Sequence, residues 1–203
     1  AGEAFATAVQ QVATAAMKDD VQPIYSAVQI ETTGQEISLL ATDKYRMALC
    51  ELPWKANAGA EGQSVLVPAR TLLEVAKTFA NQGDIAVSII NNDERQMIAF
   101  QANNRSVTAL LIKGNYPPIK SMFPTELANF TVVSKADLLE STRRVMLVVQ
   151  RDNALKYSFS DGEIALESMG NETAQASENI SAELTGEETV LALKPQYLID
   201  GLA

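Results

Sequence analysis

Histidine is absent from this 203-residue sequence, and cysteine occurs only once, as Cys50. Without histidine the protein lacks the commonest general base, a common zinc ligand and every histidine-dependent catalytic triad. A single cysteine cannot form an intrachain disulfide, and its strand-like neighbours Ala48 and Leu49 favour a small buried side chain over a reactive thiol. We therefore expect a reducing, cytoplasmic setting, with no metal site and no cofactor.

Several other signals are also missing. No apolar run reaches the length of a membrane span, residues 1–17 do not follow a signal-peptide pattern, and no P-loop or nucleotide fingerprint occurs. Carboxylate pairs are present, but they fall in expected loops, where solvated surface explains them better than catalysis does. These pairs are Asp19-Asp20, Asp93-Glu94 and Glu187-Glu188. A carboxylate-dependent hydrolase would need two acids in one pocket, so it is a weak alternative, and we expect a protein that is not an enzyme.

Basic residues are in the minority. The 16 lysines and arginines are outnumbered by 25 aspartates and glutamates, which gives a net charge of −9. Taken alone, this charge argues against nucleic-acid binding. Net charge does not say where the charges lie, however, so it does not decide the question.

Helical and alternating apolar patterns run through the whole chain and predict an α+β fold. Helices are predicted at 3–17, 68–80, 134–149 and from Pro195 onward. Pro68 and Pro195 suit a first helical turn, and Ser134 is a good N-cap residue. Hairpin turns are predicted at 33–35, 91–93, 103–104 and 161–162. Strands are predicted at 24–32, 36–41, 45–53, 64–67, 85–90, 96–101, 106–112, 130–133, 155–160, 163–169, 172–184 and 189–193.

Two segments recur at a nearly constant spacing, which predicts two copies of one α+β unit, each with two helices packed on antiparallel sheets. Residues 36–39 (EISL) align with 163–166 (EIAL), an offset of 127 positions, and residues 67–74 align with 193–200, an offset of 126. One copy spans about 120 residues, a usual size for a domain. The first copy continues with three strands after its second helix begins and the second copy does not, so we expect the second copy to be C-terminally incomplete.

Two polar stretches stand out between the apolar segments. Residues 42–46 (TDKYR) join two predicted strands, and residues 111–124 (LIKGNYPPIKSMFP) leave a strand through a glycine and three prolines. By itself, the first stretch is more typical of a β-turn than of a binding loop. We nevertheless expect the two stretches to come together as a groove for partner peptides.

Three segments together resemble the bacterial DNA polymerase III beta subunit, the sliding clamp: residues 41–48 (ATDKYRMA), 67–70 (VPAR), and 112–117 (IKGNYP) with Phe123-Pro124. The resemblance covers essentially the whole chain. It implies the DNA-clamp fold, in which two subunits with six similar domains form a ring whose helices line a central channel. By this resemblance, residues 1–123 correspond to the clamp's middle domain and 124–203 to the first two-thirds of its third domain.

The resemblance further implies a DNA polymerase processivity factor that encircles duplex DNA topologically and without sequence specificity. Such a protein would be a homodimer, act in the cytoplasm away from membranes, depend on a clamp loader, and tether the DNA polymerase III alpha subunit and other replication or repair proteins. It would make and break no bonds, so a DNA-directed DNA polymerase or nucleotidyltransferase label would belong to the holoenzyme. The alternative is an α+β protein-interaction scaffold that never encircles DNA.

Two sets of functional residues are implied as well. The family's groove between the middle and third domains takes a short partner motif with hydrophobic anchors. The matching positions are Tyr25, Thr42, Lys44, Tyr45, Arg46, Met47, Pro117, Ser121 and Met122. The helix cations that are candidates for facing DNA are Lys18, Arg70, Lys77, Arg143, Arg144 and Lys194. The family's groove is also walled by a C-terminal strand that we expect to be missing here, so weak peptide binding is expected of this chain.

Overall fold

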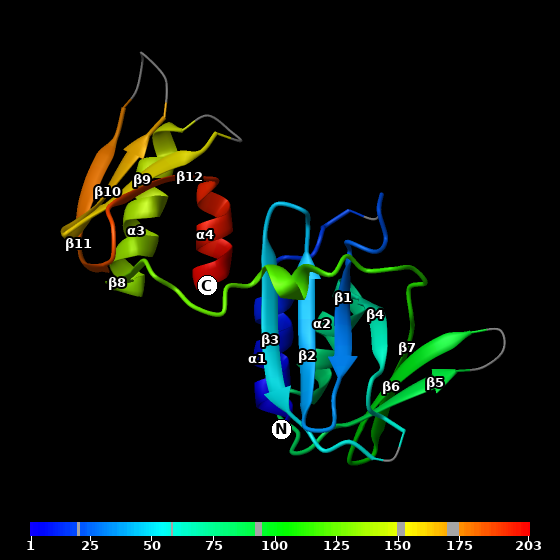
Figure 1. Cartoon of the computed structure of the whole chain (residues 1–203). Coiled ribbons are helices and arrows are strands. Elements are labelled where there is room, and N and C mark those ends of the chain that lie inside the picture. The colour runs from blue at the N-terminus through cyan, green and yellow to red at the C-terminus, as the bar shows by residue number, and fades with distance from the viewer. Residues whose placement is uncertain (20, 58, 92–94, 150–152, 170–174) are drawn as a thin grey trace. The chain divides into compact units, whose positions relative to one another are not determined.

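The computed structural model describes residues 1–19, 21–57, 59–91, 95–149, 153–169 and 175–203. The chain divides into two compact units, Ala1–Phe123 and Pro124–Ala203, and Figure 1 colours it from blue at the N-terminus to red at the C-terminus. Each unit has its own buried apolar core.

In its described residues, the first unit contains two α-helices, one short 3-10 helix and two antiparallel sheets. The helices are α1 (Gly2–Ala13), α2 (Ala69–Phe79) and the 3-10 helix η1 (Ile119–Met122). The larger sheet has the order β3-β2-β1-β4 and consists of β1 (Ala27–Thr32), β2 (Glu36–Thr42), β3 (Met47–Pro53) and β4 (Ser64–Pro68). The smaller sheet has the order β5-β6-β7 and consists of β5 (Ala86–Asn91), β6 (Gln96–Ala102) and β7 (Arg105–Leu110).

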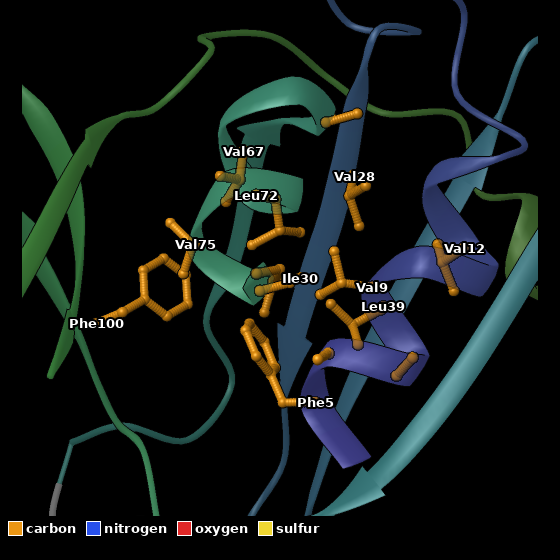
Figure 2. Close-up of a cluster of buried hydrophobic side chains, with 14 of the residues drawn as sticks. Phe5, Val9, Val12, Val28, Ile30, Leu39, Val67, Leu72, Val75 and Phe100 are labelled. Carbon is orange, nitrogen blue, oxygen red and sulfur yellow. The ribbon is translucent and has the colours of Figure 1, made fainter. Parts of the chain in front are cut away.

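The core of the first unit is formed by side chains from α1, α2 and both sheets, as Figure 2 shows. Phe5, Val9 and Val12 recur at helical spacing along α1, and all three are buried. Val28 and Ile30 are two positions apart on β1, so both side chains point into this core. Full burial of one such side chain is worth about 1.5–3 kcal/mol, so these contacts fix the sheet against the two helices.

The two helices meet where α1 begins and α2 ends. The Gly2 amide donates to the carbonyl oxygens of Gly83, at 2.7 Å, and Gln82, at 3.2 Å. A Cβ atom at residue 2 would overlap the carbonyl oxygen of Phe79, which is backbone and cannot turn away. The closeness of the two helix ends therefore requires glycine at this position.

The second unit has one five-stranded antiparallel sheet and two α-helices in its described residues. The sheet order is β12-β9-β10-β11-β8. The strands are β8 (Phe130–Val133), β9 (Leu155–Ser160), β10 (Gly162–Ser168), β11 (Ser177–Thr185) and β12 (Thr189–Leu193). The helices are α3 (Lys135–Val145), the 3-10 helix η2 (Met146–Val148) and α4 (Pro195–Leu202). The α+β clamp fold predicted from the sequence, with two helices packed on antiparallel strands, is thus present in both units.

The internal repeat is also visible in the strand pairing. Ile30 on β1 lies opposite Leu39 on β2, and Tyr157 on β9 lies opposite Leu166 on β10, so both pairs are related by the predicted offset of 127 positions. All four side chains are buried. The pairs β1–β4 and β9–β12 correspond in the same way, so the order β3-β2-β1-β4 matches β11-β10-β9-β12.

The two largest errors in the boundaries predicted for the first unit have local causes. The first helix ends at Ala13 rather than at residue 17, because the Ala15 and Ala16 amides bond to carbonyls three residues back and tighten the chain. The first strand begins at Ala27 rather than at residue 24, because the Tyr25 amide closes a turn by donating to a carbonyl three residues earlier.

In the second unit, the strands predicted at 130–133, 155–160 and 189–193 are confirmed. The predicted N-cap is also confirmed, because the Ser134 hydroxyl oxygen accepts from the Asp137 amide at 3.3 Å. The helix that follows ends at Val145 and is continued by η2. None of the helices in the described ranges has the length and apolar composition that crossing a bilayer would require.

Some sequence predictions fall on residues that lie outside the described ranges. These residues are 92–93, in the predicted turn at 91–93, and 172–174, at the start of the strand predicted for 172–184. Asp20, Asp93 and Glu94, of the carboxylate pairs predicted to lie in loops, also fall outside these ranges. The described part of that strand, β11, begins at Ser177. Pro68 is the last residue of β4 and the N-cap residue of α2, so this helix begins at Ala69, one position later than predicted.

Candidate functional site

The stretch Thr42–Arg46 forms a closed corner between β2 and β3. The Thr42 hydroxyl donates to the Arg46 carbonyl at 2.7 Å and accepts from the Lys44 amide at 3.1 Å. The Asp43 carboxylate accepts from the Tyr45 and Arg46 amides, and its second oxygen pairs with Arg46 Nε at 3.0 Å. Lys44 has a φ of +81°, which costs backbone strain in a residue other than glycine. The corner is therefore set by its own side chains before any partner binds.

The glycine–tyrosine–proline motif lies against this corner. The Tyr116 hydroxyl accepts a hydrogen bond from the Thr42 amide at 2.9 Å. The Tyr116 ring packs at a tilt on Tyr25, with ring centres 6.5 Å apart, and Lys44 Nζ lies 4.8 Å from the centre of the Tyr25 ring. Burial raises the pKa of Tyr116 to about 12, so its hydroxyl stays protonated at neutral pH. Three chain segments that are distant in sequence thus meet at Tyr116.

The segment that carries η1 is fixed to the larger sheet, across which η1 lies in Figure 1. Ile119 is buried, and Lys120 Nζ forms an ion pair with Glu51 on β3 at 2.8 Å. The hydrogen bond to Glu51 raises the pKa of Lys120. The Ser121 hydroxyl donates to the Pro118 carbonyl at 3.0 Å. The position of this segment on the first unit is therefore determined by apolar, ionic and hydrogen-bonding contacts together.

A pocket of about 310 Å³ lies between this segment and the sheet, a volume at the small end for ligand sites. Its lining residues are Gln29, Glu31, Leu40, Tyr116, Pro117, Pro118, Lys120 and Ser121. A larger hollow of about 980 Å³ lies beside Trp54 and β5, and it includes none of the residues predicted for the groove. The smaller pocket therefore has the stronger link to the predicted site.

The structure places the predicted groove residues as follows. Tyr25 and Thr42 both contact Tyr116, and Lys44 lies over the Tyr25 ring. Pro117 and Ser121 line the small pocket. Met47 lies opposite Thr42 at the start of β3. Arg46 is tied to Asp43 within the corner. Tyr45 and Met122 present apolar surface to solvent, with 81% and 65% of their areas exposed.

Tyr116 was not among the groove positions predicted from the sequence. Its contact with Thr42 joins residues that are 74 positions apart, so no local pattern indicates it. The only available signal was its place in the motif Gly114-Asn115-Tyr116-Pro117, where a tyrosine stands between a glycine and a proline.

The helix cations predicted to face DNA differ in their surroundings. Lys77 pairs with Glu74 at 2.7 Å. Arg144 binds Glu178 through two hydrogen bonds of 2.6 and 2.7 Å, and these bonds lower the pKa of Glu178 to about 2. The charges of Lys77 and Arg144 are therefore already partly neutralised, which weakens their attraction for phosphate.

The remaining four cations are not alike either. Arg70 donates to the carbonyl oxygen of Lys18 at 3.1 Å, and both residues are exposed. Arg143 is exposed on α3, whereas Lys194 is half-buried just before α4. Within the described ranges, no group of three or more acidic or cysteine side chains is arranged to hold a metal ion.

Two protein-family models together match nearly the whole length of the chain. Residues 1–118 match the model for the central domain of the DNA polymerase III beta subunit, and residues 120–203 match the model for its C-terminal domain. A beta sliding clamp homolog from Streptomyces muensis, GriR, is 39% identical over 201 residues, which cover 99% of this chain and 53% of that protein. The beta sliding clamp of Streptomyces coelicolor is 36% identical over 203 residues, covering 100% of this chain and 54% of that protein.

Solved structures show the same likeness. The DNA polymerase III subunit beta from Pseudomonas aeruginosa has a TM-score of 0.88 at 20% identity, and the match covers 100% of this chain and 55% of that one. At this identity the likeness shows the fold alone. The DNA polymerase III beta chain from Streptococcus pneumoniae has a TM-score of 0.85 at 25% identity, covering 99% and 53%. The chain spans about half the length of the curated relatives that it matches.

Proposed function

Because the chain belongs to the family of DNA polymerase III beta subunits, the beta sliding clamps, we propose that it is part of a processivity factor. This factor encircles duplex DNA in the bacterial cytoplasm and holds the DNA polymerase III alpha subunit on it through a peptide-binding groove. A clamp loader places it on DNA, and other replication and repair proteins use the same groove. The factor makes and breaks no bonds, and polymerase activity belongs to the holoenzyme.

The observation that carries this proposal is the succession of two clamp domains along one chain. The two family matches fall on the two compact units, and four strands of each unit follow the same order in their sheets. We assign the first unit as the middle domain of the clamp and the second unit as its third domain. Repeated domains of one shape are what a closed ring requires.

The charge distribution supports loose, sequence-independent contact with DNA. The net charge is −9, so the surface as a whole repels phosphate. The exposed residues of α1 are nearly uncharged and include Gln10 and Gln11. Lys18, Arg70 and Arg143 then supply a few exposed cations on or beside the helices. Few phosphate contacts mean weak, mobile binding, so retention on DNA must come from encirclement.

The geometry of the first unit supports the groove. The corner Thr42–Arg46 and the segment that carries η1 are both held rigidly, and this segment lines a small pocket. The exposed side chains of Tyr45 on the corner and Met122 at the end of η1 offer apolar surface. A short peptide that inserts hydrophobic anchors needs such a preformed site, because rigidity lowers the entropic cost of binding. We therefore propose that the nine predicted groove residues contact partner peptides.

The second unit supports a homodimer. Within its described residues, β8 is the last strand of the sheet, so one edge of β8 has no neighbouring strand. Phe130 and Val132 on β8 are 47% and 59% exposed. Unpaired edges that carry apolar side chains favour pairing with another chain, which here would be a second copy.

The deciding experiment compares retention on circular and linear DNA. The full-length gene product should be loaded onto a nicked circular plasmid with the clamp loader of the same organism and ATP, and DNA-bound protein should be separated by gel filtration. We expect the protein, as a dimer, to stay with the circle and to be lost when one restriction cut makes the plasmid linear. Both DNAs have the same length and charge, so only topology differs between them.

Equal retention on circular and linear plasmid would show ordinary charge-driven binding and would contradict encirclement. Absence of retention on either plasmid, together with intact binding of partner peptides, would favour the interaction scaffold instead.

A further inference from the structure

Strands β1 and β2 separate before β2 ends. Their antiparallel register runs from Thr32 opposite Ile37 to Gln29 opposite Leu40. Two more steps would bring residues 27 and 42 face to face, but the pairing of β1 with β2 stops at Gln29, and residue 27 pairs only with β4, on the other side of β1. The end of β2 therefore lacks a strand neighbour on the β1 side.

The Tyr116 hydroxyl lies at this gap and accepts the hydrogen bond of the Thr42 amide at 2.9 Å. Thr42 is only 5% exposed. A buried amide without an acceptor is costly, because it has given up its hydrogen bond to water. Tyr116 thus supplies the hydrogen-bond acceptor that a neighbouring strand would otherwise supply to the Thr42 amide.

Tyr116 can do this because its own position is closely constrained. Pro117 restricts the backbone of the residue before it to extended conformations. Gly114 has a φ of +155°, and a Cβ atom there would lie 2.7 Å from Cγ2 of Ile24. The Tyr25 ring also packs on the Tyr116 ring. The hydroxyl therefore acts as a fixed anchor for the corner.

We propose that Tyr116 is a positioning residue of the partner groove, whose hydroxyl holds the Thr42–Arg46 corner in the shape that binds peptide. This role rests on the proposed function, because the corner matters for affinity only if the groove receives peptides. Without the hydroxyl, the corner samples other shapes, and the apparent affinity falls in proportion to the fraction that remains competent. Tyr116 itself need not touch the peptide.

The test is Tyr116→Phe in the full-length gene product, which deletes the acceptor and keeps the ring. The probe is a fluorescent synthetic peptide that carries the clamp-binding motif of the DNA polymerase III alpha subunit from the same organism, titrated by fluorescence polarisation. Loss of one hydrogen bond predicts a Kd that is roughly threefold to tenfold higher. The Thr42 amide should also exchange faster with solvent in the free variant and regain protection when the peptide saturates it.

Tyr157→Phe is the matched control. Its hydroxyl lies 3.3 Å from Thr142 Oγ1 in the core of the second unit, so the same group is deleted from a buried residue that is not part of the corner. This control should lower thermal stability and leave the Kd unchanged.

Three outcomes count against the role. An unchanged Kd for Tyr116→Phe overturns the positioning role alone. Equal weakening by Tyr157→Phe points to general loosening and overturns it too. A wild-type protein that does not bind the peptide overturns the proposed groove, and the positioning role with it.

Discussion

Two ion pairs of arginine with a carboxylate have different structural roles in this protein. Arg46 and Asp43 are only 16% and 13% exposed, and their ion pair closes the corner from inside. Arg144 and Glu178 form their ion pair near the surface, between α3 and β11, and the two parallel hydrogen bonds fix its geometry. The first pair shapes a candidate site, whereas the second joins a helix to a sheet.

Arg144→Gln should lower the stability of the second unit in a way that depends on pH. Arg144 lowers the pKa of Glu178 from 4.5 to about 2, so the ionised carboxylate is favoured in the folded state. This contribution is fully present above pH 4.5 and is lost as the pH falls toward 2. Urea unfolding should therefore show a small difference between wild type and Arg144→Gln at pH 7 that shrinks between pH 5 and pH 2.

Arg143→Gln is the control for this measurement, because it removes the same charge from the adjacent position of α3. It should produce no such pH-dependent difference. A stability difference for Arg144→Gln that stayed constant from pH 7 to pH 2 would contradict the assignment of the effect to Glu178.

Residues whose partners are close in sequence were predictable, and residues with distant partners were not. Ser134 could be predicted as an N-cap because its acceptor role involves an amide three residues later. Tyr116 could not be identified as a site residue, because its hydrogen bond reaches Thr42, 74 positions away. Arg144 could be predicted as a helix cation, but its pairing with Glu178, 34 positions away, depends on the packing of α3 on β11.

At the scale of elements, the strands were predictable to the extent that their apolar pattern is regular. The strand predicted at 155–160 is confirmed, and each of its six residues lies opposite a residue of β10. The first helix was predicted to be too long, because its apolar spacing continues through Ala16 while the backbone has already tightened after Ala13. Periodicity therefore located the elements, and local hydrogen bonds decided where they end.

The corner between β2 and β3 provides the test at this scale. Asp43→Ala removes three hydrogen bonds at once, two to backbone amides and one to Arg46 Nε. We expect the free energy of unfolding to fall by roughly 1–3 kcal/mol, since a charged acceptor is lost and an arginine loses a carboxylate partner. Peptide affinity should fall as well, because the released corner no longer presents Tyr45 in one place. Urea unfolding and peptide titration measure the two effects.

Asp161→Ala is a matched control, because Asp161 also lies in a turn between two antiparallel strands and is exposed. It should change neither quantity appreciably. If Asp43→Ala left both the unfolding midpoint and the peptide Kd at wild-type values, the corner would not be held by its own side chains.

At the scale of the whole molecule, the two units repeat one plan with cores of different size. Among the described residues, the buried apolar side chains of the first unit come from α1, α2 and both sheets. Those of the second unit are fewer: Val145, Leu155, Tyr157, Ile164, Leu166 and Ala182. A smaller unit buries a smaller fraction of its surface and is less stable, so the repeat predicts similar folds with unequal stabilities.

We therefore expect the 203-residue chain to unfold in two transitions, with the second unit melting first. The repeat supplies equivalent probes, because Leu39 and Leu166 occupy corresponding buried positions on β2 and β10. Replacing either leucine with alanine should cost roughly 2–5 kcal/mol through lost packing and a residual cavity. Differential scanning calorimetry should show Leu166→Ala lowering only the first transition and Leu39→Ala lowering only the second. A single transition that both substitutions shift equally would show that the two units unfold as one cooperative body, and it would contradict the division of stability between two separate cores.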